Sequence, residues 1–327
     1  MNFAGVKIGH ATNQEYHTGC TVFLCPENTV GSVDVRGPAP GSREVALLAL
    51  DKPNRYVNAI TLSGGSAFGL ATADGVMRYL AEKGIGHHTP IRPVPIVPTA
   101  IVYDFFLGRG ELTPDAEMGY AACLAAGQAQ GLTAGQLAQG NVGAGAGVTV
   151  GKWTGPEGMM KGGFGVASVE VDELVVSAAA VVNAVGDVVG ADGNVLAGAR
   201  APDGGWMADG NVYRRFPDLE EIAFGTNTTL VVIITNAPLN RVGCNRLAQR
   251  GHDGLALAIR PAHTTHDGDT VFALATGQAT PPMGDAVGTA AGPFDFIGNV
   301  AVEVVAEAIR NAVRHAETAG GVPGLAS

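Results

Sequence analysis

Apolar residues recur at three- and four-residue steps in four long stretches of the chain. This spacing places them on one face of a helix, so each stretch predicts an amphipathic helix. The predicted helices span residues 66–82, 115–126, 245–259 and 299–316.

Short runs rich in Val and Ile lie between these helices and predict β-strands. Two of the runs, 174–182 and 230–234, show no alternation of apolar and polar positions. Strands of this kind are covered on both faces, so we expect one sheet packed on another with helices outside. The predicted strands lie at 147–152, 163–171, 174–183, 229–236 and 270–276.

The order of these elements argues against a doubly wound parallel sheet, in which strands and helices would alternate. The strands are clustered and the helices come in separate groups, which favours an α+β fold with mainly antiparallel sheets. We therefore expect a four-layer αββα sandwich. A length of 327 residues is compatible with one large domain or with two, and we interpret residues 1–327 as a single catalytic domain.

The charge balance limits the partners that the chain can have. It has 20 basic and 30 acidic residues, a net charge of -10, which argues against nucleic acid and anionic lipid. There is no apolar span of about 18 residues and no secretory signal pattern, so we expect a cytoplasmic protein that does not cross a membrane. The four cysteines form no CxxC motif and are expected to be reduced.

Two glycine-rich motifs resemble catalytic loops but fit them poorly. The run GAGAGVTVGK has Trp153 where a phosphate loop has Ser or Thr, so we exclude a nucleotide site and keep only Lys152 as a candidate. The run LSGGSAFGL has Phe68 where a nucleophile elbow has its second Gly. We expect Ser66 to cap the helix that follows it.

The segment HTTHDGD contains four potential metal ligands within seven residues: His263, His266, Asp267 and Asp269. Imidazole and carboxylate groups are common zinc ligands, so a metal-dependent hydrolase is one interpretation. The spacing matches no zinc-binding helix, and the segment leads directly into a predicted strand, which favours a polar turn. The residues alone leave both interpretations open.

The segment GTNTTLVVIITN ends a long irregular stretch, residues 198–226, and passes at once into a buried strand. If the Thr228 hydroxyl attacks the carbonyl of Asn227, the resulting ester can be hydrolysed to leave Thr228 with a free α-amine. Such an amine has an ordinary pKa of about 7.7 to 8.0 and can act as the base for the neighbouring hydroxyl. A β-branched residue at a strand start explains the same motif without chemistry.

Taken together, the motifs resemble the DmpA-type self-processing aminopeptidases, a family that includes L-aminopeptidase/D-esterases, β-peptidyl aminopeptidases and nylon-oligomer hydrolases. The resemblance covers nearly the whole chain. It implies an N-terminal-nucleophile-hydrolase-like αββα fold, self-cleavage into residues 1–227 and 228–327, and a homo-oligomer, a tetramer of processed αβ units. It rests on GVKIGHAT, LSGGSAFGL, IVYDF, GAGAGVTVGK, VVNAVGDV, GTNTTLVVIITN and RPAHTTHDGDTVFALATG.

The resemblance also implies a site. The scissile bond joins Asn227 to Thr228, which becomes the nucleophile. Asp267 and Asp269 match the two polar partners of the nucleophile, where carboxylates can hold the Thr228 ammonium group. The DGD sequence is similar to that of the nylon-oligomer hydrolases, whereas some relatives have Ser and Glu at these positions.

Three further residues match positions around the reacting carbonyl. The resemblance implies that Tyr103 and Asn183 donate hydrogen bonds to the oxyanion. Lys152 matches a site lysine, whose charge would lower the pKa of the amine or stabilise developing negative charge. No metal and no cofactor are implied.

The expected function is therefore an autoproteolytically activated aminopeptidase that hydrolyses small peptides, amino-acid amides or related oligoamides through a Thr228 acyl-enzyme. An acyltransferase of the ornithine acetyltransferase type, which passes the acyl group to an amine, is a second hypothesis. The metal-dependent hydrolase based on HTTHDGD and a binding protein without enzymatic activity are a third and a fourth.

Overall fold

Two five-stranded β-sheets lie face to face in the computed structural model, which describes residues 3–128, 133–208, 226–279 and 291–326. Within these sheets, neighbouring strands are antiparallel except for the pairs β5 with β6 and β13 with β15. The first sheet contains, in order, β1 (Lys7–Asn13), β2 (Thr18–Leu24), β5 (Ala59–Ser63), β6 (Thr99–Ile101) and β4 (Ser42–Arg43). The second contains β3 (Val30–Val35), β15 (Thr270–Ala275), β13 (Thr228–Thr235), β10 (Leu174–Asn183) and β9 (Gly163–Val171).

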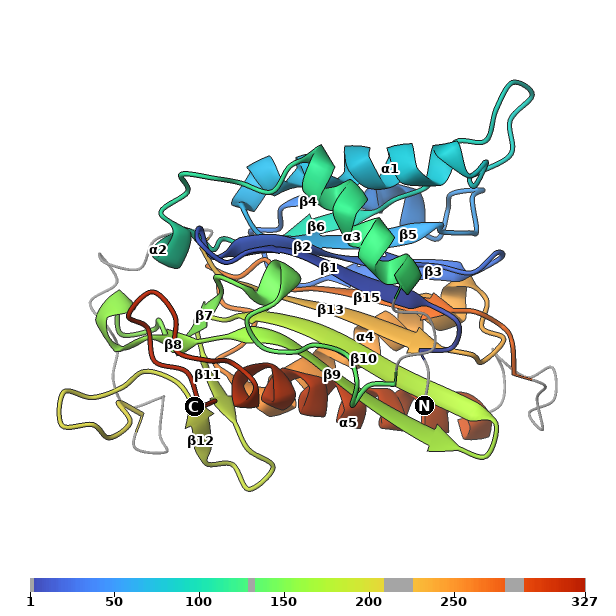
Figure 1. The fold of residues 1–327 in the computed structure, drawn as a ribbon. Helices are drawn as coiled ribbons and strands as arrows, with labels where there is room; N and C mark the ends of the chain where they lie inside the picture. Colours follow the sequence, from blue (N-terminus) through green and yellow to red (C-terminus); the bar gives the residue numbers. More distant parts are fainter. Residues whose placement is uncertain (1–2, 129–132, 209–225, 280–290, 327) are drawn as a thin grey trace.

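Helices cover the outer faces of both sheets, as Figure 1 shows. α1 (Thr72–Glu82) and α3 (Ala116–Gln128) pack on each other, and α3 lies on β1 and β2. α4 (Arg241–Ala258) and α5 (Ala291–Arg314) pack together on the other side, against the second sheet. The expected four-layer αββα sandwich is confirmed.

Shorter elements connect these layers. They include a hairpin of β7 with β8 and a small sheet in the order β12, β11 and β14. The short elements are η1 (Val45–Leu48), η2 (Ser66–Ala71), α2 (Phe105–Gly108), η3 (Gly143–Gly145), β7 (Thr149–Val150), η4 (Pro156–Gly158), β8 (Met160–Lys161), β11 (Asp187–Val189), β12 (Val195–Ala197) and β14 (Ile259–Arg260).

Strand β13 shows why its sequence has no polar face. Leu230 and Val232 belong to the hydrophobic core between the two sheets, whereas Val231 and Ile233 belong to the core beneath α4 and α5. All eight residues of the strand are buried. The prediction of a strand covered on both faces is therefore confirmed.

Two helix starts differ from the predictions. α4 begins at Arg241 because the Asn240 side chain caps it, accepting a hydrogen bond from the Gly243 amide at 2.9 Å. The expectation that Ser66 caps a helix is wrong. Gly65, with φ of 77°, occupies the cap position of η2 and makes no side-chain capping bond, and the Ser66 amide donates to the Val102 carbonyl at 2.9 Å.

The irregular stretch predicted at 198–226 is only partly described, because residues 209–225 lie outside the described ranges. At its start, the Ala199 amide donates to the buried Asp187 carboxylate at 2.8 Å, and the indole of Trp153 donates to the same oxygen at 2.9 Å. Asp187 therefore ties the beginning of this stretch to the residue that follows Lys152.

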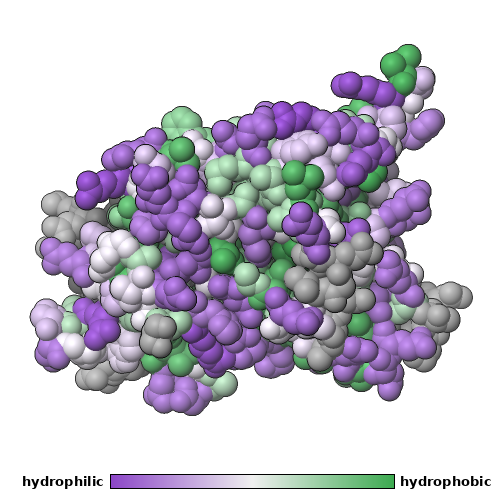
Figure 2. All heavy atoms as spheres, viewed as in Figure 1, coloured by the Kyte–Doolittle hydropathy of each residue, from purple (hydrophilic) through white to green (hydrophobic). Residues whose placement is uncertain are grey.

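Hydrophilic side chains cover much of the face shown in Figure 2, with apolar ones scattered among them. Most large apolar side chains lie instead in the cores between the layers. Within the described ranges, no helix has the length and apolar character needed to cross a membrane.

Candidate active site

The ends of neighbouring strands of the second sheet meet at the candidate site. β10 and β13 pair Asn183, the last residue of β10, with Thr228, the first residue of β13. β15 runs parallel to β13, and the segment before it forms a bridge between Asp267 and Asn227. The sheet topology thus brings together three segments that are far apart in the sequence.

The Thr228 hydroxyl lies directly against the predicted scissile peptide. Its Oγ1 donates to the Asn227 carbonyl oxygen at 2.5 Å, and the Gly268 amide donates to the same oxygen at 2.9 Å. A Cβ at Gly268 would lie 2.7 Å from Thr228 Oγ1, so this position has room only for glycine. The Gly268 amide was not among the predicted site groups, and it places a fixed donor where the carbonyl would acquire negative charge.

The two predicted carboxylates are buried and hold backbone around this centre. Asp269 Oδ1 accepts a hydrogen bond from the Thr229 amide at 2.6 Å, and its Oδ2 accepts one from Nδ1 of His263 at 2.8 Å. Asp267 Oδ2 accepts hydrogen bonds from the amide and the hydroxyl of Thr264. Burial, together with the negative charge of Asp269, raises the pKa of Asp267 to about 6.

Lys152 and Asn183 form a buried pair beside Thr228. Lys152 Nζ donates to Asn183 Oδ1 at 2.9 Å and to the Asn183 carbonyl at 3.2 Å. Burial lowers the pKa of Lys152 to about 7, although the charge of Asp267 opposes this shift. The Asn183 amide nitrogen donates to the carbonyls of Tyr103 and Thr226, each at 2.9 Å.

Tyr103 reaches this pair through its backbone. Its carbonyl accepts from Asn183, while its ring packs against Phe105 and Phe106 with centroids 4.7 and 5.6 Å away. Among the residues that the structure describes, the phenol makes no hydrogen bond to the other site residues. The oxyanion role of the phenol stays a prediction.

The HTTHDGD segment is arranged as a turn rather than as a ligand cluster. His263 and Asp269 bond to each other, and Asp267 bonds to Thr264. Across the described ranges, no group of three or more His, Cys, Asp or Glu side chains is placed to hold a metal ion. The geometry therefore favours the polar-turn interpretation of this segment.

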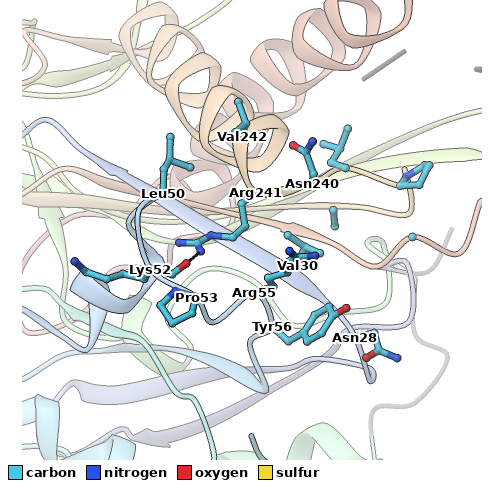
Figure 3. Close-up of a pocket in the computed structure, with 14 residues that line it drawn as sticks. Asn28, Val30, Leu50, Lys52, Pro53, Arg55, Tyr56, Asn240, Arg241 and Val242 are labelled. Atoms are coloured by element: carbon cyan, nitrogen blue, oxygen red, sulfur yellow. Dashed lines mark hydrogen bonds between the residues drawn. The ribbon is translucent and has the colours of Figure 1, made fainter. Parts of the chain in front are cut away.

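A cavity of about 710 Å³ is lined by Pro238, just past Thr235 at the end of β13 opposite to Thr228. Figure 3 shows the residues that line this cavity. Its lining includes Lys52, Arg55 and Arg241, and the Arg241 guanidinium is engaged with the backbone carbonyls of Ala49 and Lys52. None of the six predicted site side chains lines this cavity. Those around the predicted scissile bond are buried instead: Thr228 is 3% exposed and Lys152 5%.

Comparison with known proteins identifies the family. The model of peptidase family S58 matches residues 2–326. The chain belongs to this family. It is 40% identical to an uncharacterized aminopeptidase of Mycobacterium leprae over 98% of this chain and 91% of that protein. It is 31% identical to a 6-aminohexanoate-oligomer endohydrolase of Paenarthrobacter ureafaciens over 95% of this chain and 85% of that one.

Solved structures support the same fold for this S58 chain. A β-aminopeptidase from Burkholderia superposes with a TM-score of 0.70 at 22% identity, covering 98% of this chain and 89% of the other. The L-aminopeptidase D-Ala-esterase/amidase of Ochrobactrum anthropi, described as a variant of the Ntn-hydrolase fold, gives a TM-score of 0.69 at 19% identity, covering 98% and 86%. The resemblance stated from the motifs is confirmed, and the family supports a hydrolase of peptide or amide bonds.

Proposed function

We propose that this S58 peptidase cleaves its own chain between Asn227 and Thr228 and then acts as an aminopeptidase with Thr228 as its nucleophile. The observation that carries the proposal is the position of the Thr228 hydroxyl on the Asn227 carbonyl, whose oxygen also accepts from Gly268. The nucleophile, its electrophile and an oxyanion donor are therefore adjacent before any substrate binds.

Self-cleavage exchanges an amide for an ester. Thr228 Oγ1 attacks the Asn227 carbonyl carbon and loses its proton, while the oxygen becomes negatively charged against the Gly268 amide. The carbon–nitrogen bond then breaks, and the released Thr228 nitrogen takes up the proton that Oγ1 lost. Water hydrolyses the ester, leaving a carboxylate on Asn227 and a free α-amine beside the Thr228 hydroxyl.

The new amine supplies the base for turnover. It accepts the hydroxyl proton of Thr228 as Oγ1 attacks the substrate carbonyl, and it returns the proton to the leaving amine. Water then hydrolyses the acyl-enzyme. Asp267 and Asp269 lie beside the start of β13, where their charge would hold the ammonium form of this amine.

Asn183 becomes available for catalysis only after cleavage. In the uncleaved chain its two amide hydrogens are used by the carbonyls of Tyr103 and Thr226. Departure of the segment that ends in Asn227 removes the Thr226 carbonyl and frees one donor for a substrate oxyanion. Lys152 donates to the amide oxygen of the same group, which polarises the amide and strengthens its N–H donors.

The proposed substrates are small peptides, amino-acid amides and related oligoamides. The relatives named as aminopeptidases and as 6-aminohexanoate-oligomer endohydrolases define this range. Burial of the reacting residues in the uncleaved chain means that substrate must enter the space vacated near Asn227, which is 1% exposed. We also propose that processed units assemble as a homo-oligomer.

An intact-mass spectrum of the purified protein tests the proposal. We expect two fragments, residues 1–227 and 228–327, for the wild type and a single uncleaved chain for Thr228→Ala. Thr229→Ala is the matched control, because it removes the neighbouring hydroxyl and leaves the backbone amide that bonds to Asp269. It should still be cleaved after Asn227.

Two results would contradict the proposal. One is a wild type that hydrolyses an amino-acid p-nitroanilide while its chain stays at full mass. The other is cleavage of Thr228→Ala at the same bond and at the wild-type rate, since this variant has no hydroxyl to attack the carbonyl.

A further inference from the structure

His263 contacts Asp269 in two ways. Its backbone amide and its Nδ1 both reach Asp269 Oδ2, at 3.2 and 2.8 Å. The other carboxylate oxygen accepts from the Thr229 amide at 2.6 Å. Hydrogen bonds therefore run from His263 through Asp269 to the residue that directly follows Thr228.

The backbone of His263 is held in an unusual conformation. Its φ of 56° lies in the left-handed region, which only a few per cent of non-glycine residues adopt, Asn, Asp and His more often than the others. In this conformation the amide and the ring of one residue both bond to the same oxygen of Asp269. Strained backbone of this kind is concentrated at functional sites.

The ring surroundings fix which nitrogen donates. Nδ1 must carry a hydrogen to bond to the carboxylate oxygen of Asp269. Nε2 of His263 is buried and has no hydrogen-bond partner among the described residues, so a second hydrogen there would be a buried donor without an acceptor. The ring is packed edge-on against His252, with centroids 4.8 Å apart, which restrains its rotation.

We propose that His263 is a positioning residue for the reaction at Thr228. As an Nδ1–H donor it fixes the Asp269 carboxylate, and that carboxylate fixes the backbone beside the nucleophile. The effect on turnover rests on the proposed function, whereas the hydrogen-bonded chain from His263 to Thr229 does not.

Two variants of His263 distinguish the effect of its side-chain donor from the effect of its backbone conformation. His263→Asn keeps an N–H donor close to the position of Nδ1 and tolerates a positive φ. His263→Gly tolerates the same φ and has no side-chain donor. For the cleaved enzymes acting on an amino-acid p-nitroanilide, we expect His263→Gly to lower kcat about 10- to 100-fold with little change in KM. His263→Asn should retain kcat within about threefold.

A second measurement does not depend on activity. In Thr228→Ala, which keeps the chain whole, hydrogen exchange of the Thr229 amide should become about tenfold faster with His263→Gly and stay nearly unchanged with His263→Asn. Amides in the middle of β13 are the internal control for global unfolding. Nitrogen-15 NMR of the His263 ring should show the Nδ1–H tautomer.

Equal kcat in the glycine and asparagine variants, unchanged Thr229 exchange in both, or an Nε2–H tautomer would each overturn the proposal for His263. If the wild type is neither cleaved nor active, the proposed function fails, and the exchange and NMR measurements still decide whether His263 positions Asp269.

Discussion

Replacing Asn183 with alanine perturbs the group at the centre of the proposed oxyanion site. The side chain of Asn183 is fully buried and makes four hydrogen bonds. Its nitrogen donates to the Tyr103 and Thr226 carbonyls at 2.9 Å, and its oxygen accepts from Lys152 Nζ at 2.9 Å and from the Thr149 amide at 3.1 Å. Alanine removes all four bonds and leaves their partners buried.

These contacts set the expected size of the effects of Asn183→Ala on stability and on turnover. A buried hydrogen bond contributes about 0.5 to 1.5 kcal/mol, and an unpaired buried partner costs about 1 to 3 kcal/mol, so we expect a loss of about 2 to 5 kcal/mol in the free energy of unfolding. At about 2 °C per kcal/mol for a large domain, Tm should fall by about 4 to 10 °C. Loss of one oxyanion donor should lower kcat about 100- to 1000-fold, equivalent to about 2.7 to 4 kcal/mol.

Steady-state kinetics on an amino-acid p-nitroanilide measures the catalytic effect, using Asn183→Ala protein whose complete cleavage has been shown by mass. Asn311→Ala is the matched control, because that side-chain amide donates to the Val166 carbonyl at 3.0 Å from helix α5, outside the proposed site. The control should lose stability and keep its kcat. An Asn183→Ala enzyme with unchanged kcat and raised KM would refute the oxyanion role and assign Asn183 to substrate binding.

Two further predictions concern the DGD segment. Gly268→Ala should slow self-cleavage at least about tenfold in a time course followed by mass, because its Cβ would lie 2.7 Å from both Thr228 Oγ1 and the Ala39 carbonyl; wild-type kinetics would contradict this. Burial raises the pKa of Asp267 from 3.8 to about 6, so this carboxyl contributes most to stability below pH 3.8 and loses that contribution as the pH rises through about 6. Urea unfolding of uncleaved Thr228→Ala, with and without Asp267→Asn, measures this contribution. As the pH rises from about 4 to 6, the free energy of unfolding of the Asp267→Asn protein should increase relative to that of the protein that keeps Asp267. A difference that does not change with pH would show that the pKa of Asp267 is not raised.

The strength of the hydrophobic pattern explains which elements the sequence could predict. The long helices and strands β10 and β13 were predicted because most or all of their inward positions are apolar. No strand of the first sheet was among the predicted strands. Strand β1 (KIGHATN) contains few apolar residues, and β3 (VGSVDV) of the second sheet has three valines interrupted by Gly, Ser and Asp. These strands are specified by pairing with β2 and β15, and such tertiary contacts leave little local signal.

The candidate site likewise contains residues that the sequence could predict and contacts that only the fold shows. Thr228, Asn183 and Lys152 could be proposed from the sequence because side-chain chemistry and family motifs mark them, and the structure places them together. The contact of Tyr103 with Asn183 goes through its carbonyl, which no residue type reveals. The sequence singled out His263 only as a potential metal ligand, because its left-handed backbone and its bond to Asp269 appear only in the fold.

The glycine of DGD shows how a backbone function can still constrain the sequence. The Gly268 amide donates to the Asn227 carbonyl, and any non-proline residue could supply that amide. What excludes other residues is space, since a Cβ would meet the Thr228 hydroxyl and the Ala39 carbonyl. The carboxylates on either side accept hydrogen bonds from Thr264 and from His263 and Thr229. Every position of the motif thus has a role in the fold: the flanking residues anchor the turn, and the glycine brings its amide against the Asn227 carbonyl without displacing the hydroxyl that we propose attacks it.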